Sequence, residues 1–372
     1  MDFDGLKIAC KYSMLACQSN ERSFFMNKRM EELVKAYRPK DDSSNIKRVD
    51  AYQLLTSYGS FTVSEAKISP RLKKVTLSRA ALDTLLSESQ KMSVIDLEYV
   101  AAYRFFLAEA LNRICDGKLR DVLTGILHDR QSGALVFEVE GFEPDADKDF
   151  DKMLKLSTAV SYLYGKSNLD SMSGKYYARF AVENTDASDS FLRKFAERMT
   201  LHNDGSYVKE LTDYVLMMKL AEREVKGGYS LLLHLDDWED LALFSNHPIG
   251  NRSLKFSSPP SKGLSYSVHH PIFHQDRHGL PCMSYIDQFV KPATTEEGLY
   301  VYALSQSLET SQSVLGFELK VGMFVICNNH FWLHGRDKFA ENTKLYRELM
   351  RQRGIFFTNL YRQPYPDELE RF

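Results

Sequence analysis

The stretch "GFELKVGMFVICNNHFWLHGRDKF", from Gly316 to Phe339, joins two short apolar runs through the polar pair Asn328–Asn329. Short apolar runs bounded by turn-forming residues are typical of buried strands. The region 175–361 repeats this pattern of short apolar runs, with Gly, Asn, Asp and Pro between them. The other runs are "KYYARFAVEN", "LTDYVLMMKLAE", "GGYSLLLHL", "MSYIDQFV" and "RGIFFTNLY". Many short strands separated by turns favour a sandwich or a jelly roll.

The region before this one is predicted to be helical. "SRAALDTLLSES" starts with a capping serine, Ser78, and "IDLEYVAAYRFFLAEALNRICDG" repeats apolar residues at helical spacing until Gly117 ends it. A second helical run is "DKDFDKMLKLSTAVSYLYG", and three more helices are expected within the strand-rich part, in "SDSFLRKFAERM", "DDWEDLALF" and "TEEGLYVYALSQSLETS". The predicted fold class is therefore α+β, with a mainly β core flanked by helices.

The first 50 residues are expected to form a separate segment. A helix-like run there is followed by a charged stretch with proline and serine, which is typical of a linker. We expect residues 1–50 to be an extension of unknown role and residues 51–372 to form the main domain. A chain of 372 residues is ample to bury a core.

Charge and cysteine usage narrow the class of protein. The formal net charge is −2 and the sequence pI is about 6.6, which gives no reason to expect a nucleic acid or an anionic membrane as partner. The five cysteines are scattered without a C-x-x-C pair, which favours a reducing, cytoplasmic compartment. No signal peptide or run of about 20 apolar residues is present, so a soluble protein is expected.

A candidate metal site starts in "TLHNDGSYV", Thr200 to Val208. In an extended segment His202 and Asp204 point to the same side and could hold one ion together, although a polar turn between two parts of the core has the same composition. His334 follows an apolar strand-like run far downstream. As a third ligand it would complete a 2-His-1-carboxylate face, which leaves positions open on iron(II).

Two arginines follow the third ligand in "YRELMRQRGIFF". If this segment is extended, Arg351 and Arg353 share one face and could grip a carboxylate; the alternative is a basic helix end stopped by Gly354. In "GGYSLLLHLDDW", Ser230 offers a hydroxyl to a carboxylate, although the segment also fits a hairpin turn into a buried strand.

The densest histidine cluster lies in "SVHHPIFHQDRHG", with His269, His270, His274 and His278. It contains no thiolate, and Pro271 disfavours a helix that would align two of the histidines. We expect a polar loop near the mouth of a pocket. The motifs of phosphate-binding loops, dinucleotide-binding folds, HExxH metalloproteases and serine hydrolases are absent from the sequence.

Taken together, the runs "SGKYYARFAVEN", "LHNDGSYVKELTDYVLMMK", "GGYSLLLHLDDWEDL", "YIDQFV", "NNHFWLHGRDKF" and "RELMRQRG" resemble the bacterial glutarate 2-hydroxylases, also called carbon starvation induced protein D. The resemblance extends from about Tyr58 to near the C-terminus. It implies a double-stranded β-helix and a homotetramer that depends on iron(II), 2-oxoglutarate and O₂. It further implies hydroxylation of glutarate to L-2-hydroxyglutarate, with succinate and CO₂ as co-products, in lysine and glutarate catabolism.

The resemblance also implies roles for individual residues. The iron ligands fall on His202, Asp204 and His334, and the arginine that holds the distal carboxylate of 2-oxoglutarate falls on Arg353. Ser230 matches a hydroxyl that many members of the wider superfamily present to this co-substrate.

A second dicarboxylate beside 2-oxoglutarate needs further cationic donors, since buried unpaired carboxylates are unfavourable. Arg351 is the first candidate for the substrate, followed by Arg336 and Arg179, and Tyr207 is a candidate pocket wall. Two alternatives stay open: the substrate could be another small acid or an amine, or the chain could be a non-catalytic jelly-roll binding protein.

Overall fold

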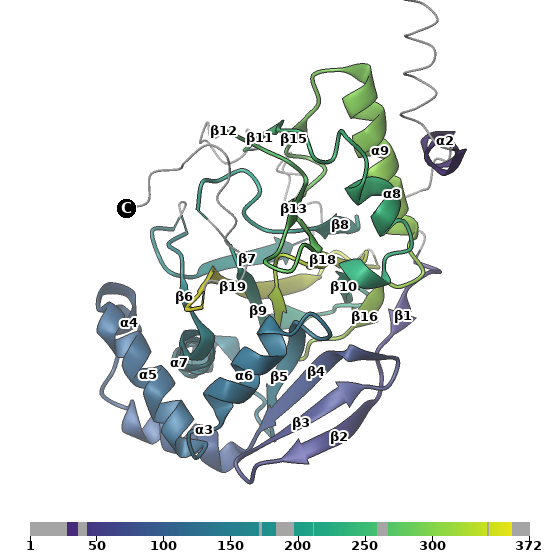
Figure 1. Ribbon diagram of the computed structural model, residues 1–372. Helices are drawn as coiled ribbons and strands as arrows, with labels where there is room; N and C mark the ends of the chain where they lie inside the picture. Colours follow the sequence, from purple (N-terminus) through teal and green to yellow (C-terminus); the bar gives the residue numbers. More distant parts are fainter. Residues whose placement is uncertain are drawn as a thin grey trace, which may run out of the picture.

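The computed structural model of the protein describes residues 28–35, 43–170, 173–183, 197–210, 212–258, 267–340 and 342–358. Two β-sheets face each other in the strand-rich region, and helices α3 to α7 gather at one side (Figure 1). The mainly β, jelly-roll-like core with flanking helices confirms the predicted fold class.

The larger sheet has nine strands in the order β2-β3-β4-β5-β17-β9-β19-β6, with β7 also paired to β19. Neighbouring strands are antiparallel except for the parallel pair β4–β5. The strands are β2 (Tyr52–Ser57), β3 (Phe61–Ala66), β4 (Ser69–Leu77), β5 (Ala134–Val139), β6 (Gly165–Ser167), β7 (Ala178–Glu183), β9 (Tyr214–Arg223), β17 (Phe324–Asn328) and β19 (Tyr346–Phe356).

The smaller sheet has five strands in the order β1-β16-β10-β18-β8. They are β1 (Lys47–Arg48), β8 (Met199–His202), β10 (Ser230–His234), β16 (Leu315–Phe317) and β18 (Trp332–Arg336). All residues of β10, β16 and β18 are buried, including the polar residues Ser230, His234, His334 and Arg336. Two short additional sheets consist of β11 (Leu254–Ser257), β12 (Ser267–His270) and β15 (Val290–Lys291), and of β13 (Phe273–Gln275) and β14 (Pro281–Met283).

Helices α6 and α7 contact strands of the larger sheet, and α3, α4 and α5 pack against α7. These helices are α3 (Arg79–Glu88), α4 (Val94–Tyr99), α5 (Ala101–Ile114), α6 (Leu119–His128) and α7 (Ala146–Tyr164). Helix α9 (Thr295–Thr310) contacts β8, and the short helices η2 (Leu235–Asp237) and α8 (Leu241–Ser245) follow β10.

Several local predictions are confirmed and others are wrong. Ser78 caps α3, because its side chain accepts a hydrogen bond from the backbone N–H of Ala81. The run expected to form one helix before Gly117 forms two, α4 and α5, which meet at the extended residue Val100. The strand predicted in "MSYIDQFV" is mainly a loop, and the helix predicted in "SDSFLRKFAERM" lies mostly outside the described residues.

The described parts of the first 50 residues lie against the domain. Helix α2 (Lys28–Lys35) packs on α9, and Arg29 of α2 forms an ion pair with Asp240. Strand β1 joins the smaller sheet beside β16. The expected domain boundary near residue 50 stays a prediction.

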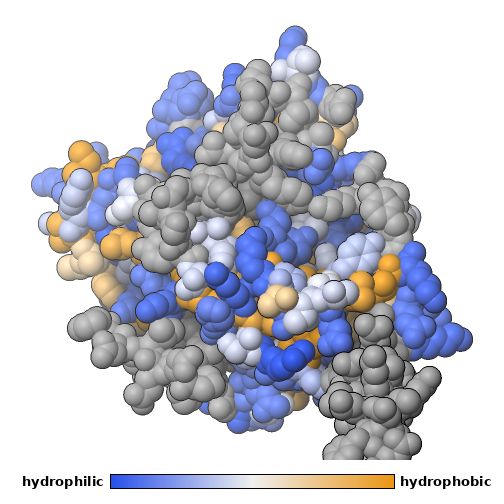
Figure 2. Space-filling model, turned by 90° about the horizontal axis from the view of Figure 1, so that it is seen from above, coloured by the Kyte–Doolittle hydropathy of each residue, from blue (hydrophilic) through white to orange (hydrophobic). Residues whose placement is uncertain are grey.

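The surface seen from above in Figure 2 is mostly hydrophilic, with hydrophobic residues in smaller groups between the polar ones. Among the described residues, no helix has the length and apolar character needed to cross a lipid bilayer.

Candidate metal centre and flanking arginines

His202, Asp204 and His334 converge in the structure as the sequence predicts. One ligand atom from each residue lies within 4.8 Å of the others, and this is the only such group of three among the described residues. The two histidine rings are 4.3 Å apart between centroids. Both histidines are buried, and Asp204 is partly buried.

Strand pairing explains the convergence of residues so distant in sequence. Strands β8 and β18 are antiparallel, and His202 stands directly opposite His334. Asp204 is not extended, contrary to the expectation, because β8 ends at His202 and the chain turns. Gly205 makes this turn possible: its φ is +83°, and a Cβ atom there would lie 2.5 Å from Thr212 Oγ1.

Two asparagines hold this turn in place. The backbone N–H of Asp204 donates to Asn329 Oδ1 at 2.9 Å, and Asn329 Nδ2 donates to the carbonyl oxygens of Asp204 (2.9 Å) and Thr212 (2.8 Å). Asn203 Nδ2 donates to the carbonyls of Asn329 and Trp332. Because Asp204 has left the strand ladder, the side-chain amide of Asn329 replaces a neighbouring strand as its partner. Sequence reasoning missed both asparagines.

The protonation states of the three residues fit metal ligation. Burial and the neighbouring His202 lower the pKa of His334 to about 3, so its imidazole is neutral. Burial alone would raise the pKa of Asp204, but the charges of Arg351 and Arg353 lower it below its usual range. The His202 Nδ1 atom lies 2.7 Å from the carbonyl oxygen of Thr200, which leaves Nε2 for a metal.

Arg351 contacts the carboxylate of the predicted metal ligand directly. Its Nη1 lies 3.0 Å from Asp204 Oδ2, and its Nη2 lies 3.6 Å from the carboxylate of Asp170. Burial would lower the pKa of Arg351, but Asp204 and Asp170 raise it, so the guanidinium stays charged. The extended reading of "YRELMRQRG" is confirmed, because the segment forms β19.

A second group of cationic side chains involves an arginine that sequence reasoning missed. Arg347 of β19 is buried, and it donates to the carbonyl of Gly228 at 2.7 Å and to Ser230 Oγ at 3.4 Å. Ser230 stands opposite Arg336 in the β10–β18 pair, and both Arg336 and Arg347 lie beside the ring of Phe339. We name Ser230, Arg336 and Arg347 the β10 centre. Burial, together with Arg347 in the case of Arg336, lowers the pKa values to about 9 for Arg336 and about 10 for Arg347.

The positions along β19 separate the two groups. Arg347, Arg351 and Arg353 are all odd-numbered positions of one strand and share a face. At about 3.3 Å per residue, Arg347 and Arg353 are roughly 20 Å apart along the backbone. Ser230 contacts Arg347, so Ser230 and Arg353 do not hold one and the same carboxylate. We name Arg351 and Arg353 the β19 centre.

Arg353 itself is 7% exposed, and its guanidinium forms no ion pair within the described residues. Its charge is one of those that lower the pKa of Asp204. Tyr207 is also buried, packs edge-to-face on Phe289, and contributes to the raised pKa of Arg351. Tyr207 therefore lies beside the β19 centre.

Arg179 lies elsewhere. It stands opposite Met350 in the β7–β19 pair, on the opposite face of β19 from Arg351. Its side chain is 43% exposed and donates from Nε to Glu348 at 2.7 Å. Arg179 is thus a half-exposed ion-pair partner, and the expectation that it binds substrate lacks structural support.

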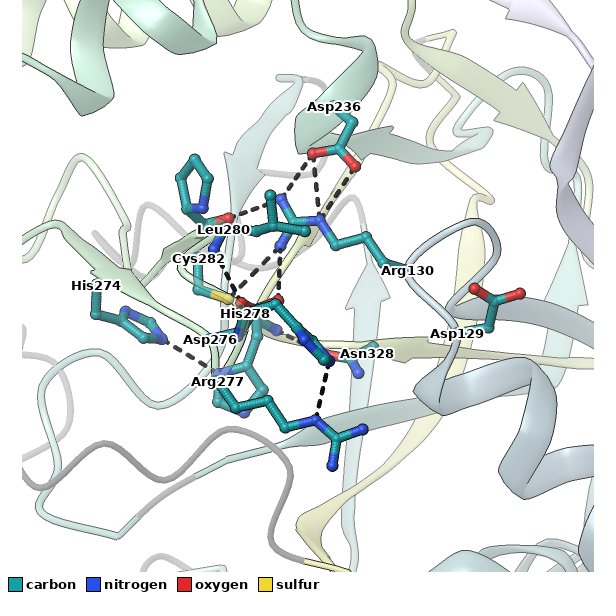
Figure 3. Close-up of polar contacts among 12 residues, drawn as sticks. Asp129, Arg130, Asp236, His274, Asp276, Arg277, His278, Leu280, Cys282 and Asn328 are labelled. Carbon is teal, nitrogen blue, oxygen red and sulfur yellow. Dashed lines mark hydrogen bonds and ion pairs between the residues drawn. The ribbon is translucent and has the colours of Figure 1, made fainter.

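Of the histidine cluster, His274 and His278 lie in separate environments (Figure 3). His274 Nε2 lies 3.3 Å from His330 Nδ1, while His278 is exposed and accepts a hydrogen bond from Arg277. His269, His270 and His274 line a cavity of about 450 Å³ that reaches Asp204. The expected position near a pocket is confirmed, but the expected loop is wrong for three of the four histidines, because His269 and His270 lie in β12 and His274 lies in β13. No metal-binding group forms there among the described residues.

The donor set fits iron(II) in particular. Two imidazole nitrogens and one carboxylate on one side of an ion leave positions for other ligands. His334 Nδ1 is buried without a hydrogen-bond partner in the described part of the chain, as expected where ring nitrogens are kept for a metal. A jelly roll with this triad defines a non-haem iron(II) oxygenase.

Comparison with known proteins refines this class. The chain belongs to the CsiD family, which matches residues 61–356. Glutarate 2-hydroxylase of Citrobacter koseri is 48% identical over 309 residues, covering 83% of this chain and 94% of the relative. Glutarate 2-hydroxylase of Salmonella typhimurium is 48% identical over 296 residues, covering 80% of this chain and 90% of the relative.

Solved structures agree on the fold. Asparagine oxygenase in complex with Fe(II), 2S,3S-3-hydroxyasparagine and succinate has a TM-score of 0.59 at 16% identity, covering 74% of this chain and 92% of that one. The non-haem iron oxygenase OrfP in complex with Fe and alpha-ketoglutaric acid has a TM-score of 0.55 at 15% identity, covering 76% and 93%.

Proposed function

We propose that this protein is an iron(II)- and 2-oxoglutarate-dependent dioxygenase that hydroxylates glutarate at carbon 2. The observation that supports this most strongly is the convergence of His202, Asp204 and His334 in a chain 48% identical to glutarate 2-hydroxylases. The products would be L-2-hydroxyglutarate, succinate and CO₂, and the reaction would serve lysine and glutarate catabolism.

Two separate cationic centres suit a reaction that requires two dicarboxylates. Ser230 and Arg336 lie two strand positions, or roughly 7 Å, from the level of His334, so a dicarboxylate attached to the metal at one end could reach the β10 centre with the other. We therefore assign the distal carboxylate of 2-oxoglutarate to the β10 centre, rather than to Arg353. The β19 centre is then available to glutarate, with Tyr207 as a pocket wall.

Burial makes these assignments energetically reasonable. A carboxylate that leaves water needs charged or hydrogen-bonding partners, and arginine supplies paired donors. Arg347 has a buried Nε–H without a partner in the described residues, so it can still donate to a ligand. Arg351 already contacts Asp204, so it can orient this metal ligand as well as bind substrate.

Iron(II), when bound, would supply the activation of O₂ and the removal of hydrogen from carbon 2 of glutarate. The chain's own residues have the task of orientation. Asn329 fixes the backbone of Asp204, and each of the two cationic centres binds a carboxylate of one reactant.

The direct test is anaerobic reconstitution with iron(II), followed by measurement of 2-oxoglutarate consumption in air with and without glutarate. We expect glutarate to stimulate consumption and 2-hydroxyglutarate to accumulate. Stimulation by another small acid or an amine, but not by glutarate, would contradict the assigned substrate. No stimulation by any candidate would favour a binding protein.

The arginine assignments have their own test. Arg347→Met should raise the KM for 2-oxoglutarate by about 10- to 100-fold, and Arg353→Met should raise the KM for glutarate to a similar extent, because each loses a charge-assisted hydrogen bond. Arg179→Met is the control and should change neither value more than about twofold. If the KM for 2-oxoglutarate rose in the Arg353 variant alone, Arg353 would be the residue that binds the distal carboxylate of 2-oxoglutarate.

We also propose a cytoplasmic homo-oligomer, a tetramer by resemblance, with no nucleic acid or membrane partner. Cys115, Cys282 and Cys327 support the reducing compartment, because they are buried and free of disulfides. Sedimentation of the purified protein would measure its oligomeric state.

A further inference from the structure

The segment Ser43–Asp50, which we name the strap, lies outside the residues that match the CsiD family, 61–356. We propose that Arg48 of the strap is a positioning residue for the co-substrate: it neutralises Asp337 and thereby keeps the β10 centre attractive to a carboxylate. This inference rests on the proposed function insofar as it assigns the distal carboxylate of 2-oxoglutarate to that centre.

The strap is attached firmly to the sheet that carries the metal-binding histidines. Its strand β1 runs parallel to β16, with Lys47 opposite Leu315 and Arg48 opposite Gly316. The approach is close because Gly316 lacks a side chain: a Cβ atom there would lie 2.4 Å from Ile46 Cγ2. The strap therefore occupies a defined position at the edge of this sheet, next to β16.

Two residues of the strap converge on Asp337, which directly follows Arg336 in the sequence. Asp337 is 4% exposed. Its carboxylate accepts a hydrogen bond from Ser43 Oγ at 2.6 Å and lies 3.5 Å from Arg48 Nη2. The Arg48 guanidinium lies 3.5 Å above the ring of Tyr229, which precedes Ser230. Arg48 is thus held against the residue that precedes β10 and the residue that follows β18.

Asp337 is close enough to act on the β10 centre electrostatically. Its charge raises the pKa of Arg336, against the larger lowering by burial and by Arg347. A buried carboxylate in this place would also repel a carboxylate that enters the centre. Arg48 and Ser43 bind Asp337 from the strap, and the positive charge of Arg48 offsets its negative charge.

The first measurement is the affinity of the protein for 2-oxoglutarate, by anaerobic titration calorimetry on the iron(II)-loaded full-length chain, together with KM values. Arg48→Met should weaken 2-oxoglutarate binding by about three- to tenfold, because Arg48 is 43% exposed and water screens part of its charge. The KM for glutarate should change less than about twofold. Arg48→Lys should restore most of the loss.

A double variant distinguishes two roles of Arg48: neutralising the charge of Asp337, and only anchoring the strap to the domain. If Arg48 acts by neutralising Asp337, then Arg48→Met combined with Asp337→Asn should bind 2-oxoglutarate within about twofold of the wild type. A double variant as weak as Arg48→Met alone would overturn the inference, as would an unchanged affinity in Arg48→Met. Lys47→Met, which removes the neighbouring exposed cation of β1, is the matched control and should have wild-type affinity.

The two proposals fail differently. Calorimetry with 2-oxoglutarate does not require turnover of glutarate, so a different substrate would leave the Arg48 result standing. Equal weakening of 2-oxoglutarate and glutarate binding in Arg48→Met would show a general loss of structure and would overturn the inference, even in a protein that hydroxylates glutarate.

Discussion

Replacing Asn329 with alanine should loosen the metal ligand Asp204 while leaving the ligand itself in place. The substitution removes three hydrogen bonds, from the backbone N–H of Asp204 and to the carbonyls of Asp204 and Thr212. Asn329 is 5% exposed, so water replaces these bonds poorly. At about 1 kcal/mol for each bond, the free energy of unfolding should fall by about 3 kcal/mol. For a domain of this size, that lowers Tm by roughly 4 °C.

The effect on the metal should exceed this general loss. A residue that orients a metal ligand typically contributes about 10- to 100-fold in metal affinity. Iron(II) affinity would be measured by anaerobic titration well below Tm, and Tm by calorimetry without metal. The control is Asn342→Ala, which removes only exposed hydrogen bonds and should shift stability by less than about 0.5 kcal/mol. Unchanged iron(II) affinity in Asn329→Ala would refute the reasoning, whatever happened to Tm.

Three other outcomes follow from the structure. Gly205→Ala should lower the free energy of unfolding by about 1 to 3 kcal/mol, because it combines a φ of +83° with a contact to Thr212; wild-type denaturant stability would contradict this. Burial lowers the folded pKa of both His234 and His274 to about 3, below the unfolded value of 6.5. The neutral histidines therefore contribute to the free energy of unfolding above pH 6.5, and this contribution is lost as the pH falls toward 3. Urea unfolding at pH 5.5 should show a free energy of unfolding about 2 kcal/mol lower than at pH 7. His274→Asn should reduce this difference. Asp204→Ala should abolish succinate formation while Tm changes by only a few degrees, and residual activity near that of the wild type would remove the iron assignment.

The sequence predicted the metal ligands because their signal is chemical and partly local. His202 and Asp204 are separated by one residue, and His334 follows an apolar run. That these segments meet follows from the antiparallel pairing of β8 with β18. The local geometry was less accessible: Asp204 lies in a turn, and its position depends on Asn329, which is 125 residues away in sequence. No periodicity in either segment indicates that contact.

The roles of the arginines depend on strand register even more. Period-two alternation groups Arg347, Arg351 and Arg353 on one face, so Arg347 could have been found by extending the pattern four residues back. The sequence could not show that Ser230 contacts Arg347, because that contact requires the two sheets to face each other. Arg179 was misplaced for the opposite reason, since its chemistry suits a carboxylate but its strand position turns it outward.

The role proposed for the strap follows from its contacts and not from its composition. The sequence of the strap, with its serines and charged residues, resembles that of a linker. Yet Arg48 and Ser43 bind a buried carboxylate that borders a pair of buried arginines. Two buried arginines favour the entry of an anion. A buried carboxylate next to them would weaken that attraction. Balancing Asp337 from the strap resolves the conflict, because Arg48 then offsets the negative charge that would oppose a carboxylate entering the β10 centre.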